Sequence, residues 1–225
     1  MNPLPADWND IDTVLLDMDG TLLDLHFDNF FWLQHLPRRY SEQHGVELSQ
    51  ARHNLQQRMA STQGTLDWYC TDFWSQQFNL DVIDLKREVI HLVDERPQAL
   101  NFLQTLGTLG KQRILITNAH RDSVDIKFAV TSIEPLLDTV ISSHDYGYPK
   151  EHPLFWQHLQ KNMPFDPSRT LFIDDSEPVL HSAKTYGIAH LLCIDKPDSQ
   201  QPARPCSNFA SIGDFDQILN LTGSA

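Results

Sequence analysis

The sequence predicts an α/β fold in which a mostly parallel sheet is covered by helices and interrupted by an inserted all-helical segment. Short apolar runs alternate with helical patterns over most of the chain, as expected for β-α-β units. The region 25–95 breaks this alternation, because it contains no convincing strand. The 225 residues, of which 40% are hydrophobic, suffice for a full core and such an insertion.

Five short apolar runs are the expected strands. They are rich in aliphatic and β-branched residues, as strands buried on both faces of a parallel sheet are. The runs are 13–17 (TVLLD), 113–117 (RILIT), 139–143 (TVISS), 170–174 (TLFID) and 190–194 (HLLCI). Because β-α-β connections are right-handed and lie over the sheet, the runs predict one sheet with helices on both faces.

Two segments between these runs carry the start and stop signals of helices. Residues 97–109 begin with a proline, which suits a first helical turn, and are followed by Gly110. Residues 176–187 begin with a serine N-cap and end at Gly187. The stretch 196–208 contains proline, serine and glutamine and is expected to be an exposed loop.

Residues 25–95 are expected to form a helical domain, which leaves 1–24 and 96–225 for the α/β core. The segments "FDNFFWLQHL" and "LDWYCTDFWSQQF" in this insertion are helical and rich in aromatic residues. Trp68 and Tyr69 suit two roles: stacking on a planar base, or packing the core of a small helical domain.

Asp28, on the way into the insertion, likewise has two interpretations. Its carboxylate suits a hydrogen bond to a ligand or the cap of the insertion's first helix.

Charge excludes several classes of partner. The net charge of −13 repels nucleic-acid polymers and anionic membranes, whereas a small anion can bind where a cation and local donors compensate.

No apolar stretch approaches the roughly eighteen residues that a membrane span needs. The start, "MNPLPADWNDID", has neither a basic segment nor an apolar one, so we expect a cytoplasmic protein.

Cysteine and histidine spacing predicts no soft-metal site. Cys70, Cys193 and Cys206 are odd in number and have no CxxC spacing, so we expect reduced, packed thiols. The eleven histidines show neither HxH nor HExxH spacing and do not cluster with cysteine along the chain. A zinc site is therefore not expected.

The first expected strand ends among acids. In "LLDMDGTLLD" (residues 15–24), three aspartates stand within eight positions. Carboxylates held close together resist ionising unless a cation lies between them. Asp17 and Asp19 therefore suggest a metal site or an acid/base pair, and a polar turn is the alternative.

Further polar residues follow the other expected strands. Thr117 and Asn118 follow the second, Lys150 follows the third, and Asp174 and Asp175 end the fourth. Since ligands of open α/β sheets bind beyond the carboxyl ends of the strands, we expect these groups at one edge. Oxygen donors beside an ammonium suit Mg²⁺ and a phosphate, which favours the metal site over a polar turn.

The motifs "DMDGT", "TN", "YPK" and "FIDDS", in this order, resemble the four motifs of haloacid dehalogenase-like (HAD) phosphohydrolases. The insertion after the first motif resembles the helical C1-type cap of that superfamily. The resemblance implies a HAD-like Rossmannoid core with a helical cap, and phosphate ester hydrolysis through an aspartyl phosphate.

The resemblance also implies roles for the motif residues. Asp17 is the nucleophile, and Asp19 is the general acid and base. Thr117 and the backbone of Asn118 bind phosphate oxygens, and Lys150 neutralises charge on the phosphoryl group and the nucleophile.

The same resemblance implies Mg²⁺ as the cofactor. Its ligands are Asp17, the backbone carbonyl of Asp19, and Asp175, and Asp174 acts directly or through water. Members of the superfamily that cleave carbon–halogen bonds lack the second aspartate of the first motif. The presence of Asp19 at that position therefore argues against a dehalogenase.

Flanking segments narrow the resemblance. The segments "DTVLLDMDGTLLDLHFDNFFW", "LDWYCTDFWSQQ", "GKQRILITNAH", "GYPKE" and "RTLFIDDSE" together resemble the bacterial 5′-nucleotidases specific for GMP and IMP. This resemblance implies a purine nucleoside monophosphate as substrate. A sugar-phosphate phosphatase is the alternative, and a phosphomutase or an inactive binding protein fits less well. Whether the protein is a monomer or a dimer is left open.

Overall fold

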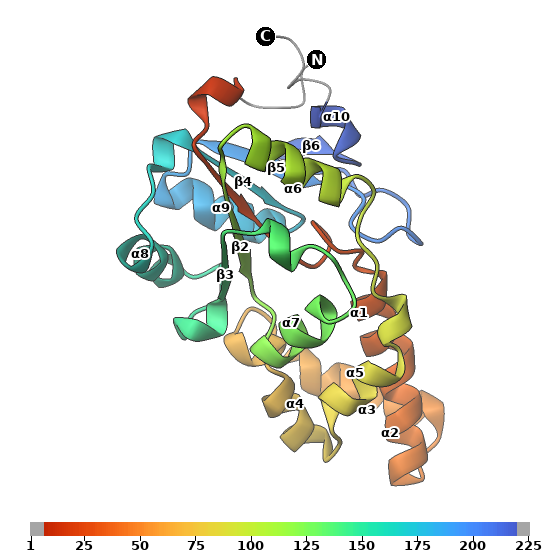
Figure 1. Cartoon of the computed structure of the whole chain (residues 1–225). Coiled ribbons are helices and arrows are strands. Elements are labelled where there is room, and N and C mark those ends of the chain that lie inside the picture. The colour runs from red at the N-terminus through yellow and green to blue at the C-terminus, as the bar shows by residue number, and fades with distance from the viewer. Residues whose placement is uncertain (1–6, 220–225) are drawn as a thin grey trace.

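A parallel sheet forms the centre of the computed structural model, which describes residues 7–219 (Figure 1). The strand order in this sheet is β3-β2-β1-β4-β5-β6, and every neighbouring pair is parallel. The strands are β1 (Thr13–Leu16), β2 (Gln112–Thr117), β3 (Thr139–Ser142), β4 (Thr170–Asp174), β5 (His190–Ile194) and β6 (Ala210–Ile212). The predicted parallel α/β fold is confirmed.

Strand β1 is central and buried along its whole length. In the register of the sheet, Leu15 lies between Ile114 of β2 and Phe172 of β4. Strand β6 was not predicted, because its three residues form no apolar run. It directly follows the predicted loop 196–208 and is held by pairing with β5.

Helices cover both faces of the sheet. Val14 and Leu16 pack into the core on one face, beneath α6 (Ala99–Thr108), α7 (Arg121–Phe128) and α10 (Asp216–Leu219). Leu15 points to the other face, beneath α8 (Pro153–Asn162) and α9 (Glu177–Tyr186). Side chains alternate across a strand, so one short apolar run contributes to both cores.

The start of α6 differs from its prediction. Pro97 was expected in the first turn, but the helix begins at Ala99. Gln98 precedes it with a left-handed backbone (φ +62°), and this N-cap residue separates the proline from the helix.

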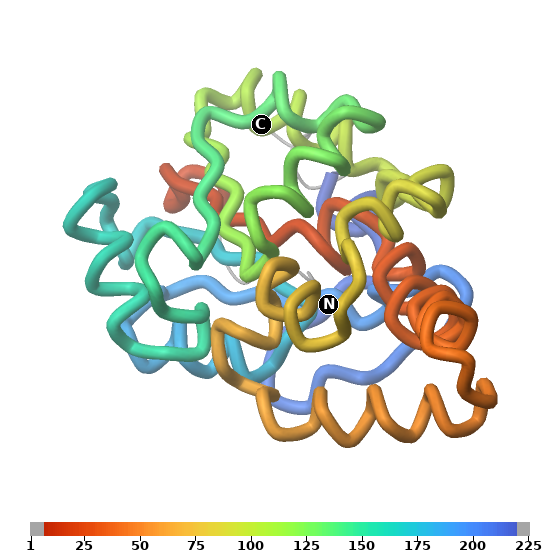
Figure 2. Tube along the Cα trace, turned by 90° about the horizontal axis from the view of Figure 1, so that it is seen from below, coloured from red at the N-terminus to blue at the C-terminus, as the bar shows by residue number. Residues whose placement is uncertain are grey.

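Residues 26–92 form helices and turns without a strand. The helices are α1 (His26–Phe30), α2 (Leu36–His44), α3 (Leu48–Ala60), α4 (Thr71–Phe78) and α5 (Val82–Glu88). They surround a third apolar core that includes Phe27, Phe31, Trp74 and Phe78. A π-helical turn, Phe31–His35, joins α1 to α2. In the view from this end of the molecule, α2 and α3 (orange) lie to one side, away from the green turns of α7 (Figure 2).

The chain enters and leaves this helical insertion at one place. The amide of Asp24 donates to the carbonyl of Asp94 (2.9 Å), and that of Arg96 donates to the carbonyl of Leu22 (2.9 Å). The two segments that connect the insertion to the core therefore lie side by side, as in a hinge. The domain limits at 24/25 and 95/96 stay a prediction. Between residues 7 and 219 there is no helix with the length and apolarity to span a membrane.

One expectation about cysteine is wrong. Cys193 of β5 and Cys206 of the following loop form a disulfide, and Cys70 is free. Nothing in the spacing indicated this pair, because the loop folds back beside its own strand only in the tertiary structure.

Candidate active site

The candidate site lies at the carboxyl edge of the sheet, where three neighbouring strands end. Asp17 directly follows β1, and its amide donates to the carbonyl of Ile173 (3.0 Å). Thr117 is the last residue of β2, and Asp174 is the last residue of β4. These polar side chains are buried, which costs free energy unless each finds a partner or a ligand.

Lys150 reaches this edge from the loop after β3. Its ammonium donates to the carboxylate of Asp17, to Oδ2 of Asp174 (2.7 Å) and to the carbonyl of Ile116 (3.2 Å). Its backbone is fixed as well, because its amide donates to Oδ1 of Asn118 (2.9 Å) and its carbonyl accepts from Trp156 (2.9 Å). The buried ammonium is thus held against two carboxylates.

A third carboxylate completes the group. One oxygen each from Asp17, Asp174 and Asp175 lies within 4.8 Å of the others. Oδ1 of Asp174 accepts from the amide of Ser176 (2.8 Å), and Asp175 pairs with Arg204, which is largely exposed. Burial, with repulsion from Asp17, raises the pKa of Asp175 to about 7. Burial also raises the pKa of Asp17 against the attraction of Lys150.

Gly20 allows this close approach. Its backbone is left-handed (φ +90°), and a Cβ here would lie 2.8 Å from Cγ of Asp175 and 2.9 Å from Cβ of Pro197. Only glycine fits the turn after β1 without displacing a metal-ligand candidate.

Asp19 belongs to a different buried network. Nζ of Lys127 donates to Asp19 (2.6 Å) and to Asp28 (2.6 Å), and Nζ of Lys86 donates to Asp28 (2.7 Å) and Ser123 (3.1 Å). Although burial opposes it, the two lysines hold the pKa of Asp28 well below its usual range. Burial raises the pKa of Asp19 despite Lys127.

This network corrects one interpretation of Asp28. The residue does not cap the first helix of the insertion, because the N-cap position of α1 is Leu25 and carries no side-chain capping bond. Asp28 of α1 and Lys86 of α5 instead meet Lys127 of α7, so the network ties the insertion to the core.

All ten residues that the sequence proposed for the site line one cavity of about 660 Å³. They are Asp17, Asp19, Asp28, Trp68, Tyr69, Thr117, Asn118, Lys150, Asp174 and Asp175. Apolar side chains of the insertion, including Trp32, Leu33 and Met59, form the opposite wall. The cavity is therefore charged at the sheet edge and largely apolar on the cap side, where Asp28 and Lys86 are the charged lining residues.

A hydrogen-bonded chain crosses from one wall to the other. The hydroxyl of Tyr69 donates to Oε1 of Glu151 (2.9 Å), and Nδ2 of Asn118 donates to Oε2 (2.9 Å). The sequence analysis did not find Arg204, which lines the cavity, nor Glu151 and Lys127, which hydrogen-bond to cavity residues. The position of Glu151 directly after Lys150 could have indicated it. In the sequence, Lys127 and Arg204 do not differ from ordinary surface cations.

Histidine and cysteine, which do not cluster along the chain, come together at one place in the structure. Cys70, His120 and His144 each offer a ligand atom within 4.8 Å of the others. They come from three separate segments, so no spacing along the chain could reveal the group.

The chain belongs to the haloacid dehalogenase-like hydrolases, because the model of that family matches residues 11–187. Among curated proteins, the GMP/IMP nucleotidase YrfG of Escherichia coli is 40% identical over 212 residues, covering 94% of this chain and 96% of that protein. The pyrophosphatase PpaX of Bacillus pumilus is 27% identical over 181 residues, covering 79% of this chain and 80% of that protein.

Solved structures agree on the fold. A HAD phosphatase from Thermococcus onnurineus superposes with a TM-score of 0.79 at 20% identity, covering 95% of this chain and 98% of that one. At such identity the likeness shows the fold and leaves the reaction to the site residues.

Proposed function

We propose that this hydrolase is a Mg²⁺-dependent phosphatase that removes the phosphate of purine 5′-monophosphates, GMP and IMP foremost. The observation that carries the proposal is the shared cavity, in which Asp17, Asp19 and Lys150 face an apolar, aromatic wall. The 40% identity to a GMP/IMP nucleotidase over nearly the whole chain supports the same substrates. A volume of about 660 Å³ suits a ligand of nucleotide size.

The residues present fit a magnesium ion. Asp17, Asp174 and Asp175 offer hard oxygen donors, and their buried charges exceed the single ammonium of Lys150 that contacts them. Asp17, Asp175 and the backbone carbonyl of Asp19 would hold the ion. Asp174 would act directly or through water, because Lys150 and Ser176 already engage its oxygens. A bound Mg²⁺ supplies positive charge beside the transferring phosphoryl group.

The first half-reaction follows from Asp17 and Asp19. A carboxylate oxygen of Asp17 forms a bond to phosphorus, and the bond from phosphorus to the nucleoside oxygen breaks. That oxygen takes a proton from Asp19, whose raised pKa suits a general acid. The products of this step are a nucleoside and an aspartyl phosphate on Asp17.

The second half-reaction reverses the proton movement. Water loses a proton to Asp19, its oxygen forms a bond to phosphorus, and the bond to Asp17 breaks. Lys150 stays beside Asp17 throughout and stabilises negative charge in both steps. Phosphate and the original enzyme result.

The phosphate oxygens are held by the end of β2. Oγ1 of Thr117 accepts from the amide of Ala119 (3.0 Å), which leaves the hydroxyl proton free to donate to a phosphate oxygen. The amide of Asn118 is the second donor. Asn118 is fixed through its side chain to Lys150 and Glu151.

The cap wall would recognise the nucleoside. Trp68 and Tyr69 are half-buried cavity residues, and their rings suit stacking on a purine. Asp28 also lines the cavity, but both of its oxygens accept from lysines, so we assign it to positioning the cap rather than to the substrate.

A phosphate-release panel tests the proposal. GMP, IMP, AMP, a hexose phosphate and an aryl phosphate are compared with and without millimolar Mg²⁺. We expect the highest kcat/KM for GMP and IMP and negligible release without the metal. Higher kcat/KM for the hexose phosphate would contradict the substrate class, and no release from any compound would contradict a phosphatase.

A further inference from the structure

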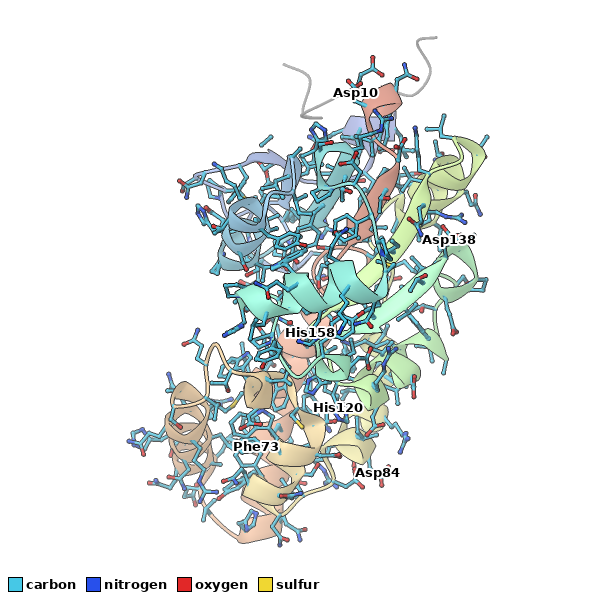
Figure 3. The ribbon with its side chains drawn as sticks, turned by 90° about the vertical axis from the view of Figure 1, so that its left-hand side faces the viewer. Asp10, Phe73, Asp84, His120, Asp138 and His158 are labelled. Carbon is cyan, nitrogen blue, oxygen red and sulfur yellow. A yellow bond between two sulfur atoms is a disulfide. The ribbon has the colours of Figure 1, made fainter. Side chains whose placement is uncertain are left out.

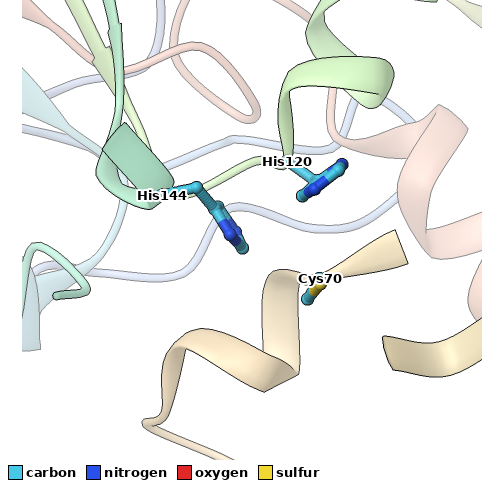
Figure 4. Close-up of side chains that lie close together, drawn as sticks. All are labelled: Cys70, His120 and His144. Carbon is cyan, nitrogen blue, oxygen red and sulfur yellow. The ribbon is translucent and has the colours of Figure 1, made fainter. Parts of the chain in front are cut away.

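Three potential metal ligands meet where the helical insertion touches the core. Cys70 precedes α4 of the insertion, His120 precedes α7, and His144 lies in the turn Ser143–Asp145 after β3. Their ligand atoms lie within 4.8 Å of one another. Figure 4 shows the side chains reaching from separate segments toward a common space. In Figure 3, His120 lies between the core above and the cap residue Phe73 below.

We propose that Cys70, His120 and His144 form a second metal site, which binds a zinc-class ion. One thiolate and two imidazoles are the donors that Zn²⁺ selects in proteins. In a tetrahedral zinc site the ligand atoms lie roughly 3.5 Å apart, so small side-chain rotations would close the group around an ion. The fourth position would be taken by water.

His144 provides an independent indication of a ligand. Its Nε2 is buried and has no hydrogen-bond partner among residues 7–219. An orphaned buried ring nitrogen costs free energy that a bound ion would recover.

The other two ligands are held by their surroundings. Nδ1 of His120 lies 2.9 Å from Oγ1 of Thr71 and 3.6 Å from Asp122, and its Nε2 lies 3.9 Å from Asp72. Such outer partners orient histidine ligands and increase their basicity. Sγ of Cys70 accepts from the amide of Phe73 (3.4 Å) at the start of α4.

The two sites would select different metals. Asp17, Asp174 and Asp175 offer only oxygen, which Mg²⁺ prefers, whereas the second site offers sulfur and nitrogen, which Mg²⁺ avoids. Because Cys70 belongs to the insertion and both histidines belong to the core, a bound ion would join the two. Zinc would then stabilise the folded protein by mass action.

Cobalt(II) is a suitable probe, because a cobalt–thiolate bond gives a charge-transfer band that oxygen ligands do not. All three cysteines of the chain lie within the described residues, and the other two form a disulfide, so Cys70 is the thiol that can give this band. Untagged, chelator-treated protein is titrated with Co²⁺ in saturating Mg²⁺. We expect one equivalent to give the band and Zn²⁺ to abolish it.

Cys70→Ser is the sharpest variant, because serine is a favourable N-cap and keeps the start of α4 intact. We expect it to lose the band and to weaken Zn²⁺ binding by about 100-fold or more. His144→Ala should behave alike, and the control His53→Ala, an exposed histidine of α3, should bind as wild type. The rise in Tm with Zn²⁺ should follow the same pattern.

Absence of the band in folded wild-type protein would overturn the proposal. So would a band that survives in His144→Ala with unchanged Zn²⁺ affinity, because the thiolate would then bind without the histidine. Circular dichroism confirms that each variant is folded before the comparison is made.

Discussion

Two buried clusters of lysine and aspartate differ in their balance of charge. The sheet-edge cluster (Asp17, Lys150, Asp174, Asp175) sets three carboxylates against one buried ammonium, with the largely exposed Arg204 at its margin. The hinge cluster (Asp19, Asp28, Lys86, Lys127) sets two carboxylates against two ammonium groups.

The difference separates a candidate cation site from a joint between the insertion and the core, and Asp19 of that joint also serves as the proposed general acid and base. In the sheet-edge cluster, burial raises the pKa of Asp175 to about 7, so the group resists full ionisation without more positive charge. In the hinge cluster the pKa of Asp28 lies well below its usual range, and every charge has a partner. An excess of buried carboxylates therefore indicates a cation site, whereas a balanced group joins two parts of the molecule.

The largest effect is expected from Asp17→Asn. The amide cannot attack phosphorus, so kcat should fall by about a thousand-fold or more. Lys150 keeps its bond to Asp174, so the fold should remain. Steady-state phosphate release and circular dichroism measure the two properties, and a variant that kept a tenth of wild-type kcat would contradict a covalent mechanism.

Matched lysine variants test the comparison itself. Lys150→Met should lower kcat/KM by at least about 100-fold, because the phosphoryl group loses its ammonium. Lys127→Met should lower the free energy of unfolding by about 3 kcal/mol, because it leaves Asp19 without its cation and weakens the joint to the cap. It should lower kcat/KM less than Lys150→Met does, because Lys127 affects the reaction only by holding the general acid Asp19. Urea unfolding and kinetics measure both. If Lys127→Met lost more activity than Lys150→Met, the roles of the two clusters would be reversed.

The pH dependence of metal binding should follow the sheet-edge cluster. Mg²⁺ binds ionised carboxylates, so its affinity should rise as pH increases through about 7, where Asp175 releases its proton. The metal-free protein should show the opposite trend in stability. Its folded state binds more protons than the unfolded chain between pH 4 and 7, so the free energy of unfolding should fall as pH rises through this window.

Calorimetric Mg²⁺ titrations at several pH values, paired with urea unfolding without metal, test both trends. Asp28 does not contribute above pH 5, since it is ionised there in both the folded and the unfolded state. Metal affinity independent of pH from 5 to 8 would contradict the assignment of Asp175 as a ligand.

The smallest effect is expected at the cap. Trp68→Ala should raise KM for GMP by about 10-fold, because base stacking contributes roughly 1–3 kcal/mol, and should leave KM for an aryl phosphate nearly unchanged. Phe73→Ala is the control, since Phe73 packs on Trp74 and does not line the cavity. Equal effects of Trp68→Ala on both substrates would assign this ring to packing.

The sequence predicted the strands and the site residues whose positions depend on local patterns and on the order of elements along the chain. Apolar runs gave five strands, and residues such as Asp17 and Lys150 were brought to one cavity because parallel strands end at the same edge. It missed what depends on tertiary contact. Asp28 accepts hydrogen bonds from Lys86 and Lys127, which lie 58 and 99 positions further along the chain. No local pattern distinguishes such an aspartate from one that caps a helix. The cluster of Cys70 with two histidines was missed for the same reason.

The proposed reaction depends most on Asp17 as the group that accepts the phosphoryl group. Acid quenching during turnover of GMP with Mg²⁺, followed by mass spectrometry of the peptides, measures this directly. We predict that the peptide containing Asp17 gains the mass of one phosphoryl group, located on that residue, and that the gain is absent in Asp17→Asn. A phosphoryl group on any other residue, or rapid turnover with no phosphorylated peptide, would contradict the account.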